Sequence, residues 1–231
     1  WNFYFRPPPI EPASKDKMAF PLPDKPSIAV LPFTNMSGDS EQEYFADGLT
    51  EEIITALSKV PRVFVIARNS SFIYKGKPVK VQQVSEELGV QYVLEGSVRK
   101  DENRVRVTAQ LVDALNGRHL WAKTFDRELQ DIFALQDQIS LKVVAALQVK
   151  LTEGEQALIV AGRTTNFEAY AKFLRGVEYV KQYNREGNLL ARRMAEEAIH
   201  LDPNYPRGYR LLATTHWLDV RLGFSKDPKQ S

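Results

Sequence analysis

The chain lacks cysteine altogether and has three histidines among its 231 residues. Without cysteine it can hold no disulfide, no thiolate zinc site and no cysteine nucleophile. The histidines, His119, His200 and His216, lie far apart in different predicted elements, and no H-x-x-x-H spacing exists. Because a zinc site needs several ligands brought together, each histidine is interpreted as a surface or packing residue.

The chain also lacks a large net charge of either sign. The 31 Lys and Arg residues oppose 29 Asp and Glu residues, which leaves a net charge of +2. Such a small net charge would not attract the phosphate backbone of nucleic acid, so we expect no nucleic-acid contact by this chain. Long apolar runs of about 18 residues are missing too, and nothing within the chain is therefore expected to cross a bilayer.

Aromatic residues crowd the first positions, which read WNFYFRPPPIEP. The prolines at 7–9 exclude a helix there, and the prolines of residues 7–26 favour an extended spacer without packed structure. Trp and Tyr prefer the membrane–water interface. Residues 1–6 are therefore interpreted either as the exit of a membrane-spanning helix that lies upstream or as a leader that packs by chance.

Ordered structure is expected from Ser27 onward. SIAVLPF, residues 27–33, is a short apolar run typical of a buried strand. Ser40 and Glu43 then form a capping box, which predicts the start of a helix. The apolar face of that helix recurs every fourth residue, at Phe45, Leu49, Ile53 and Leu57.

The pattern continues as strand, helix, three strands and helix, at 62–67, 81–89, 90–100, 104–111, 119–128 and 132–149. Residues 104–111 alternate strictly between apolar and polar, which predicts an antiparallel strand with one wet face. Asn116 and Gly117 suit a two-residue type I′ turn. The fold class is therefore α/β, a mixed five-stranded sheet with packed helices over residues 27–150.

Only helical patterns follow residue 150. Small residues recur before Asp202-Pro203, at Ala191, Ala195 and Ala198. Immediately afterwards, Tyr209-x-x-Leu212-Ala213-x-x-His216 stands where a tetratricopeptide repeat has W-x-x-L-G-x-x-Y. FEAYAKFLRGVEYVKQY, from 167 to 183, supplies a preceding helix. Residues 151–231 are therefore interpreted as the truncated start of a tetratricopeptide-repeat region, in preference to a generic helical hairpin.

No motif for chemistry is complete. YKGKP, at 74–78, fails as a phosphate loop because Ser71 and Pro78 stand where glycine and Ser or Thr are required. The acidic stretch 39–47 could chelate a cation, but acids are favoured at a helix start in any case, and the calcium-loop pattern is absent. We predict no catalytic residue, no cofactor and no metal site.

The most function-like loop is ARNSSFIYKGK, which follows a predicted strand end. Crevices beyond strand ends often bind ligands, although Asn and Ser are also ordinary loop formers. The candidate ligand or partner residues in this loop are Arg68, Asn69, Ser70, Ser71, Tyr74 and Lys75.

Four segments in order resemble a known family: PSIAVLPFTNMSGDSEQEYFADGLTEEIITALSKV, VIARNSSFIYKGKPV, ELGVQYVLEGSVRK and RVRVTAQLVDALNGRHLWAKTFDRELQDIFALQDQI. Together, residues 27–150 resemble the TolB-like α/β domain of bacterial multidomain proteins. The resemblance implies tetratricopeptide repeats afterwards and, upstream, an effector domain with one membrane helix. The effector is commonly a class III adenylate or guanylate cyclase domain, or a winged-helix DNA-binding domain. The resemblance brings no catalytic residue and no ligand site.

We therefore expect a non-catalytic sensory and protein-interaction region of a membrane-anchored bacterial signalling protein, foremost an adenylate or guanylate cyclase. The expected partners are a protein or peptide on the repeats, the membrane through an upstream helix, and a second copy in a homodimer. This region would lie on the periplasmic side of the inner membrane, or alternatively in the cytoplasm. Alternatives are the sensor of a winged-helix transcriptional regulator, a TolB-like envelope scaffold, and an enzyme within the chain.

Overall fold

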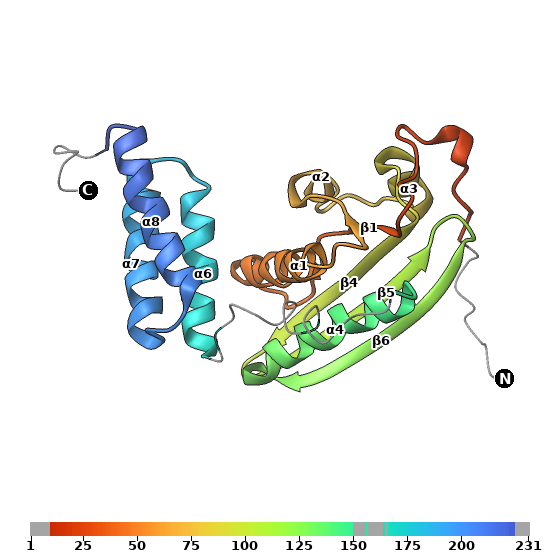
Figure 1. The fold of residues 1–231 in the computed structure, drawn as a ribbon. Coiled ribbons are helices and arrows are strands. Elements are labelled where there is room, and N and C mark those ends of the chain that lie inside the picture. Colours follow the sequence, from red (N-terminus) through yellow and green to blue (C-terminus); the bar gives the residue numbers. More distant parts are fainter. Residues whose placement is uncertain (1–9, 150–155, 157–163, 165, 225–231) are drawn as a thin grey trace.

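The computed structural model describes residues 10–149, 156, 164 and 166–224. Over these ranges the chain forms a mixed sheet with packed helices, followed by three helices side by side (Figure 1). The proposed membrane-exit residues 1–6 and most of the segment 151–165 lie outside the described residues. The α/β fold class predicted from the sequence is confirmed.

One sheet holds the strands in the order β3-β1-β4-β5-β6. β1 (Ser27–Val30) pairs in parallel with β3 (Phe64–Val65) and with β4 (Tyr92–Asp101). β4 pairs antiparallel with β5 (Arg104–Asp113), and β5 with β6 (Arg118–Glu128). A sixth strand, β2 (Thr34–Asn35), lies beside β4. The sequence prediction omits it because two residues carry no readable alternation.

The predicted alternation along β5 is confirmed. Within residues 104–111 the fully buried residues are Val105, Val107, Ala109 and Leu111, and the alternation ends at Val112, which is also fully buried. The turn from β5 to β6 is wider than the predicted two-residue type, because it spans four residues and only Gly117 among them has a positive φ, +61°. The Asp113 carboxylate accepts hydrogen bonds from the backbone N–H of Leu115, at 3.1 Å, and of Asn116, at 3.3 Å, which hold this wider loop.

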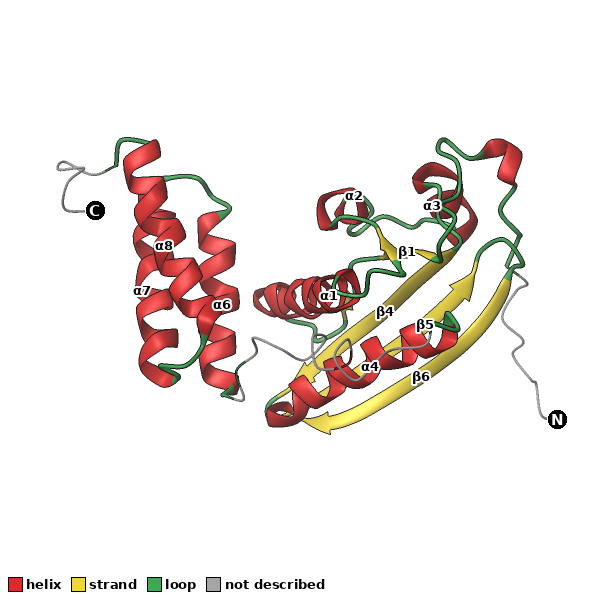
Figure 2. Ribbon diagram, in the orientation of Figure 1, coloured by secondary structure: helices red, strands yellow, loops and turns green. Residues whose placement is uncertain are grey.

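Helices α1 (Glu43–Ser58) and α4 (Ile132–Ala146) cover one face of the sheet, and α3 (Val81–Leu88) covers part of the other (Figure 2). α3 ends at Gly89 as predicted, with a left-handed φ of +63°. The expected capping box at Ser40 is wrong. A 3₁₀ turn, η2 (Ser40–Gln42), precedes α1, and its cap is Asp39, which accepts a hydrogen bond from the backbone N–H of Glu41 at 2.9 Å.

Residues 10–26 pack on the sheet domain, which corrects the expectation of an unpacked spacer. The backbone N–H of Ala13 donates to the carbonyl of Ala114 at 2.7 Å, and that of Ser14 donates to Oε1 of Glu86 at 2.9 Å. Ala13 is buried in a second core with residues of α3 and of the strands. Proline content alone does not reveal this docking, because the apolar residues between the prolines supply the contact surface.

Between residues 166 and 224 the structure describes three helices, which we call the three-helix part: α6 (Phe167–Val180), α7 (Arg185–Leu201) and α8 (Pro206–Arg221). The three small residues singled out in α7, Ala191, Ala195 and Ala198, are fully buried. Gly176 serves the same end in α6, since a Cβ there would lie 2.4 Å from Cδ2 of Leu211. The predicted close helix approach is confirmed, while the assignment to the tetratricopeptide family stays a prediction.

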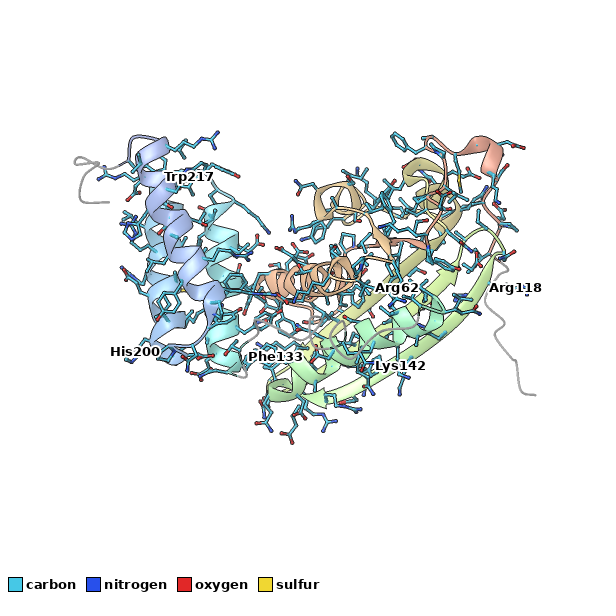
Figure 3. All side chains as sticks on the ribbon, in the orientation of Figure 1. Arg62, Arg118, Phe133, Lys142, His200 and Trp217 are labelled. Carbon is cyan, nitrogen blue, oxygen red and sulfur yellow. The ribbon has the colours of Figure 1, made fainter. Side chains whose placement is uncertain are left out.

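The hydrophobic core runs without interruption from the sheet into the helices. Phe45 of α1 meets Phe167 of α6 edge-on at 6.2 Å between ring centroids, and Phe133 of α4 meets Tyr170 at 5.1 Å. Nε2 of Gln136 also donates to the Tyr170 hydroxyl at 3.0 Å. Helix α6 therefore packs on α1 and contacts α4 through these side chains, and Figure 3 labels Phe133 at this junction.

Candidate functional site

The candidate site lies where the chain leaves β1 and the connections separate. The β1-to-β3 connection carries α1 over one face of the sheet, whereas the β3-to-β4 connection carries α3 over the other. Ligands in open α/β sheets tend to bind where neighbouring connections diverge in this way. A groove of about 630 Å³ begins at this point and runs over β4 and β5.

We call this the β1 groove. It is formed by the chain after β1, by the loop before α3 and by the strand face that α1 and α4 leave free, with the lining residues Leu31, Pro32, Thr34, Tyr74, Gly76, Lys77, Pro78, Val79, Glu95, Gly96, Ser97, Thr108 and Gln110. Its floor is polar. Glu95 accepts a hydrogen bond from Nε2 of Gln110 at 2.5 Å across β4 and β5, and Ser97 lies opposite Thr108 in the next row.

Gly96 of β4 lets the buried ring of Phe33 pack closely beneath the groove floor. A Cβ at this position would lie 2.3 Å from the carbonyl oxygen of Thr108 and 2.7 Å from Cε2 of Phe33. Phe33 is buried, and its backbone N–H donates to Oγ1 of Thr50 in α1 at 3.0 Å. The floor of the groove is therefore tied to α1 through the residue between β1 and β2.

The six loop residues singled out in the sequence lie in different environments in the structure. Tyr74 alone among them lines the β1 groove. Its hydroxyl donates to Oε2 of Glu87 at 2.5 Å, and burial, together with Glu87, raises the pKa of Tyr74. Asn69 and Ser70 are exposed, whereas Ser71 is fully buried. The predicted polar loop is corrected in shape, because its first part is helix α2 (Arg68–Phe72).

Arg68 and Lys75 turn toward α1. Arg68 forms an ion pair with Glu51 at 3.0 Å and stacks on the ring of Phe72 at 3.8 Å from its centroid.

Lys75 donates to Oδ2 of Asp47 at 2.7 Å and lies 3.1 Å from Oε1 of Glu43. Burial raises the pKa of Asp47, and Lys75 opposes that rise. Burial lowers the pKa of Lys75, but its bonds to both carboxylates outweigh this and raise it. The acidic residues at the start of α1 thus fix the loop, which gives them a structural role.

Helix α1 also holds the C-terminal helices. Leu174 of α6 sits directly over Gly48, where a Cβ would come within 2.5 Å of both its methyl carbons. Arg207 of α8 forms an ion pair with Glu52, whose side chain is almost fully buried. The guanidinium of Arg175 lies over the ring of Tyr44, 5.4 Å from its centroid. α1 therefore contacts the β1–β2 connection on one side and the three-helix part on the other.

The groove residues on β4 and β5 and the contacts of α1 were not singled out by sequence reasoning. The polar residues that alternate with the buried ones along β5 could be read from the sequence, but they indicate only that this face of the strand is exposed to solvent. The pairing of Glu95 with Gln110 requires the register of β4 on β5. The described ranges of the chain contain no group of three or more His, Asp or Glu side chains that could hold a metal ion. None of their helices is long and apolar enough to cross a membrane.

Comparison with known proteins places this fold in context. The chain is 53% identical over 209 residues to a Rhizobium meliloti (strain 1021) protein named "Putative adenylate cyclase 3". That alignment covers 89% of the chain but only 36% of the longer relative. Among solved structures, TolB from Acinetobacter baumannii is 20% identical with a TM-score of 0.41, over 56% of this chain and 30% of that chain.

Lipoprotein GNA1162 from Neisseria meningitidis is 22% identical with a TM-score of 0.36, over 55% of this chain and 99% of that chain. Residues 24–142, which include the whole sheet and the β1 groove, match the family model of the second domain of HilA/YgeH-like transcriptional regulators. The chain belongs to this family.

Proposed function

We propose that the chain is the non-catalytic regulatory region of a membrane-anchored bacterial adenylate cyclase and controls cyclic nucleotide synthesis by that protein. The observation that carries the proposal is the 53% identity, over 209 residues, to the Rhizobium meliloti relative. Because the chain spans 36% of that relative, the proposal assigns catalysis to a part of the protein outside these residues.

In this proposal the chain has three parts. Residues 1–26 connect to a membrane helix, residues 27–150 form the TolB-like sensory domain, and residues 151–231 begin a tetratricopeptide-repeat region. The upstream helix would anchor the protein in the inner membrane. This region would then lie in the periplasm, or in the cytoplasm if the chain does not cross the membrane. A signal would act through dimerisation of the protein, which brings two cyclase halves together.

The contacts of α1 support a route for the signal. A small ligand in the β1 groove would contact Pro32 and Thr34, which flank Phe33. Phe33 is hydrogen-bonded to Thr50 of α1, and α1 packs on α6 and is joined to α8 by the ion pair of Glu52 with Arg207. Because packed helices move as units between discrete arrangements, a change at the β1–β2 connection can shift the three-helix part. The loop residues Arg68 and Lys75 would set the position of α1 in that movement.

The three-helix part is the proposed protein-binding region. Large apolar side chains are exposed along α8 and just after it, namely Tyr209, Trp217, Val220 and Leu222. Stacked helix pairs present extended surfaces to peptides and proteins, so a protein or peptide partner is assigned to these helices. The proposal gives this chain no contact with nucleic acid.

The second candidate is the sensor region of a transcriptional regulator. The family match over residues 24–142 favours it, because the family consists of second domains of such regulators. In that case the effector would be a DNA-binding domain and the output would be transcription. The regulatory role of the present chain would be the same in both proteins.

The test uses the complete cyclase candidate in bacterial cells that lack their own adenylate cyclase. Cyclic AMP is measured for the intact protein, for a protein without residues 27–231, and for the single variant Phe33→Ala. We expect the deletion to change basal synthesis or abolish its response to growth conditions. Equal and equally regulated cyclic AMP levels in all three proteins would refute the regulatory role. No cyclic AMP from the intact protein would favour the transcriptional candidate.

A further inference from the structure

The strand face that α1 and α4 leave uncovered carries a second cavity, which adjoins the β1 groove. It has a volume of about 320 Å³ and is lined by Arg99, Asp101, Arg104, Arg106 and Asp126. On this face of the sheet, α3 packs mainly on β1 and β4. Three cationic and two anionic side chains line the cavity, which leaves it a net charge of +1.

The strand register puts two arginines directly opposite one another. Arg99 of β4 pairs with Arg106 of β5, and Arg106 pairs in turn with Asp126 of β6. Like charges opposite one another destabilise a strand pair. Arg106 is compensated by Asp126, but no carboxylate partner for Arg99 is found in the described part of the chain. Arg99 therefore lines the cavity with guanidinium N–H groups that are not bonded to a carboxylate of the described residues.

Asp126 holds two guanidinium groups in fixed orientations. Nε and Nη2 of Arg104 donate to Oδ1 at 3.2 and 2.5 Å, and the same atoms of Arg106 donate to Oδ2 at 3.2 and 2.6 Å. These bonds hold the pKa of Asp126 below its ordinary value, so the carboxylate stays charged. Each guanidinium has five N–H groups, so each keeps donors that are not bonded to Asp126.

From this geometry we propose that the cavity binds a phosphate group carried by a small soluble molecule, held by Arg99, Arg104 and Arg106 and oriented by Asp126. Arginine forks match the tetrahedral oxygens of phosphate and bind it through paired hydrogen bonds. A bound phosphate would also relieve the opposition of Arg99 and Arg106. The hydroxyl row of Thr108 and Thr124, in the next register position, would accept or donate further hydrogen bonds.

The proposal is tested on the full 231-residue chain with sodium pyrophosphate as the probe, by calorimetric titration at low ionic strength. We expect Arg99→Gln and Arg106→Gln to weaken binding by at least about tenfold, because each loses charge-assisted hydrogen bonds. Arg106→Lys keeps the charge but loses the fork and should lose most of the affinity. The matched control Arg118→Gln removes an exposed arginine from the same strand layer, outside the cavity, and should leave binding unchanged.

The variant Asp126→Asn distinguishes positioning of the arginines by Asp126 from attraction of the ligand by positive charge alone. The variant makes the cavity more positive, so a purely electrostatic surface would bind pyrophosphate more tightly. If Asp126 positions the arginines, the variant binds more weakly while its melting temperature shows that it is folded. Tighter binding by Asp126→Asn, equal binding by Arg106→Lys, or no binding by the unmodified chain would each overturn the proposal.

A second arm separates a soluble ligand from a lipid headgroup. The chain is sedimented with vesicles of phosphatidylcholine alone and with vesicles that also contain phosphatidylglycerol. We expect pyrophosphate to bind and neither vesicle to retain the chain. Retention by the anionic vesicles that depends on Arg106, without pyrophosphate binding, would overturn the soluble assignment. These readouts need no cyclase activity, so their failure is distinct from failure of the proposed function.

Discussion

Arg207 of α8 and Glu52 of α1 form an ion pair that is buried between the three-helix part and the sheet domain. Burial, with the nearby charge of Arg210, lowers the pKa of Arg207 to about 10. Desolvation of two such groups is costly, and their attraction compensates only while both are present. We therefore expect the pair to add little net stability, whereas loss of either partner alone should be costly.

Replacing one partner of this pair should be far more harmful than replacing both. Glu52→Ala leaves a buried guanidinium without its carboxylate and should lower the free energy of unfolding by about 3–5 kcal/mol. The double variant Glu52→Leu with Arg207→Met should recover most of that loss. Urea unfolding measures both, with the exposed Lys142→Ala as control. A double variant as unstable as Glu52→Ala would contradict the argument.

Gly48 and Leu174 should behave as a coupled pair. Gly48→Ala places a methyl group against Leu174 and should destabilise the chain by about 1–3 kcal/mol through overpacking. Leu174→Ala makes room for it, so the double variant should be more stable than the sum of the two single effects predicts. Denaturant unfolding of all four proteins gives the coupling energy. Strict additivity would mean that α1 and α6 separate to accommodate the methyl group.

Two glycines in the left-handed region make a matched test of the docked segment 10–26. Gly76→Ala meets open space and should cost only backbone strain, about 1–2 kcal/mol. Gly89→Ala carries the same strain and also brings a Cβ within 2.7 Å of the carbonyl oxygen of Phe20. We expect the larger loss for Gly89→Ala. The difference between the two should vanish in a chain that begins at residue 24, and its persistence there would show that another contact causes it.

Stability should fall as the pH rises above about 10. The pKa of Tyr74 and that of Lys75 are both raised above their ordinary values of 10.0 and 10.5. The unfolded chain therefore loses these protons at lower pH than the folded chain, and unfolding becomes easier as the pH rises. Melting temperatures between pH 8 and 11.5 measure the slope. Tyr74→Phe should flatten it, whereas replacement of the exposed Tyr183 by Phe should not.

Much of the fold could be predicted because the relevant signals are local. The alternation of β5, the glycine stop of α3 and the small residues of α7 each determine structure within a few residues. The capping box at Ser40 failed for a reason of the same kind. Asp39, one residue earlier, also has a short acceptor side chain, and the sequence pattern does not decide between two adjacent candidates.

The site was harder to predict because its residues meet only across strands. Glu95 and Gln110 are joined by register, and Arg99 meets Arg106 for the same reason. Register depends on the whole sheet, and a shift by one residue would move each side chain to the other face. Of the predicted loop, Tyr74 reached the groove, whereas Lys75, its neighbour, points to α1 and Asp47.

The central place of β4 has a consequence for the order of folding. β1 finds its partner β4 about 60 residues later in the chain, as the pairing of Ile28 with Tyr92 shows, whereas α6, α7 and α8 contact their immediate neighbours. Local contacts form faster than distant ones. We therefore expect the three helices to pack together first. The apolar face of α6 would stay exposed until the sheet domain folds and brings α1 and α4 against it. Pulse-labelling hydrogen exchange would resolve these two stages.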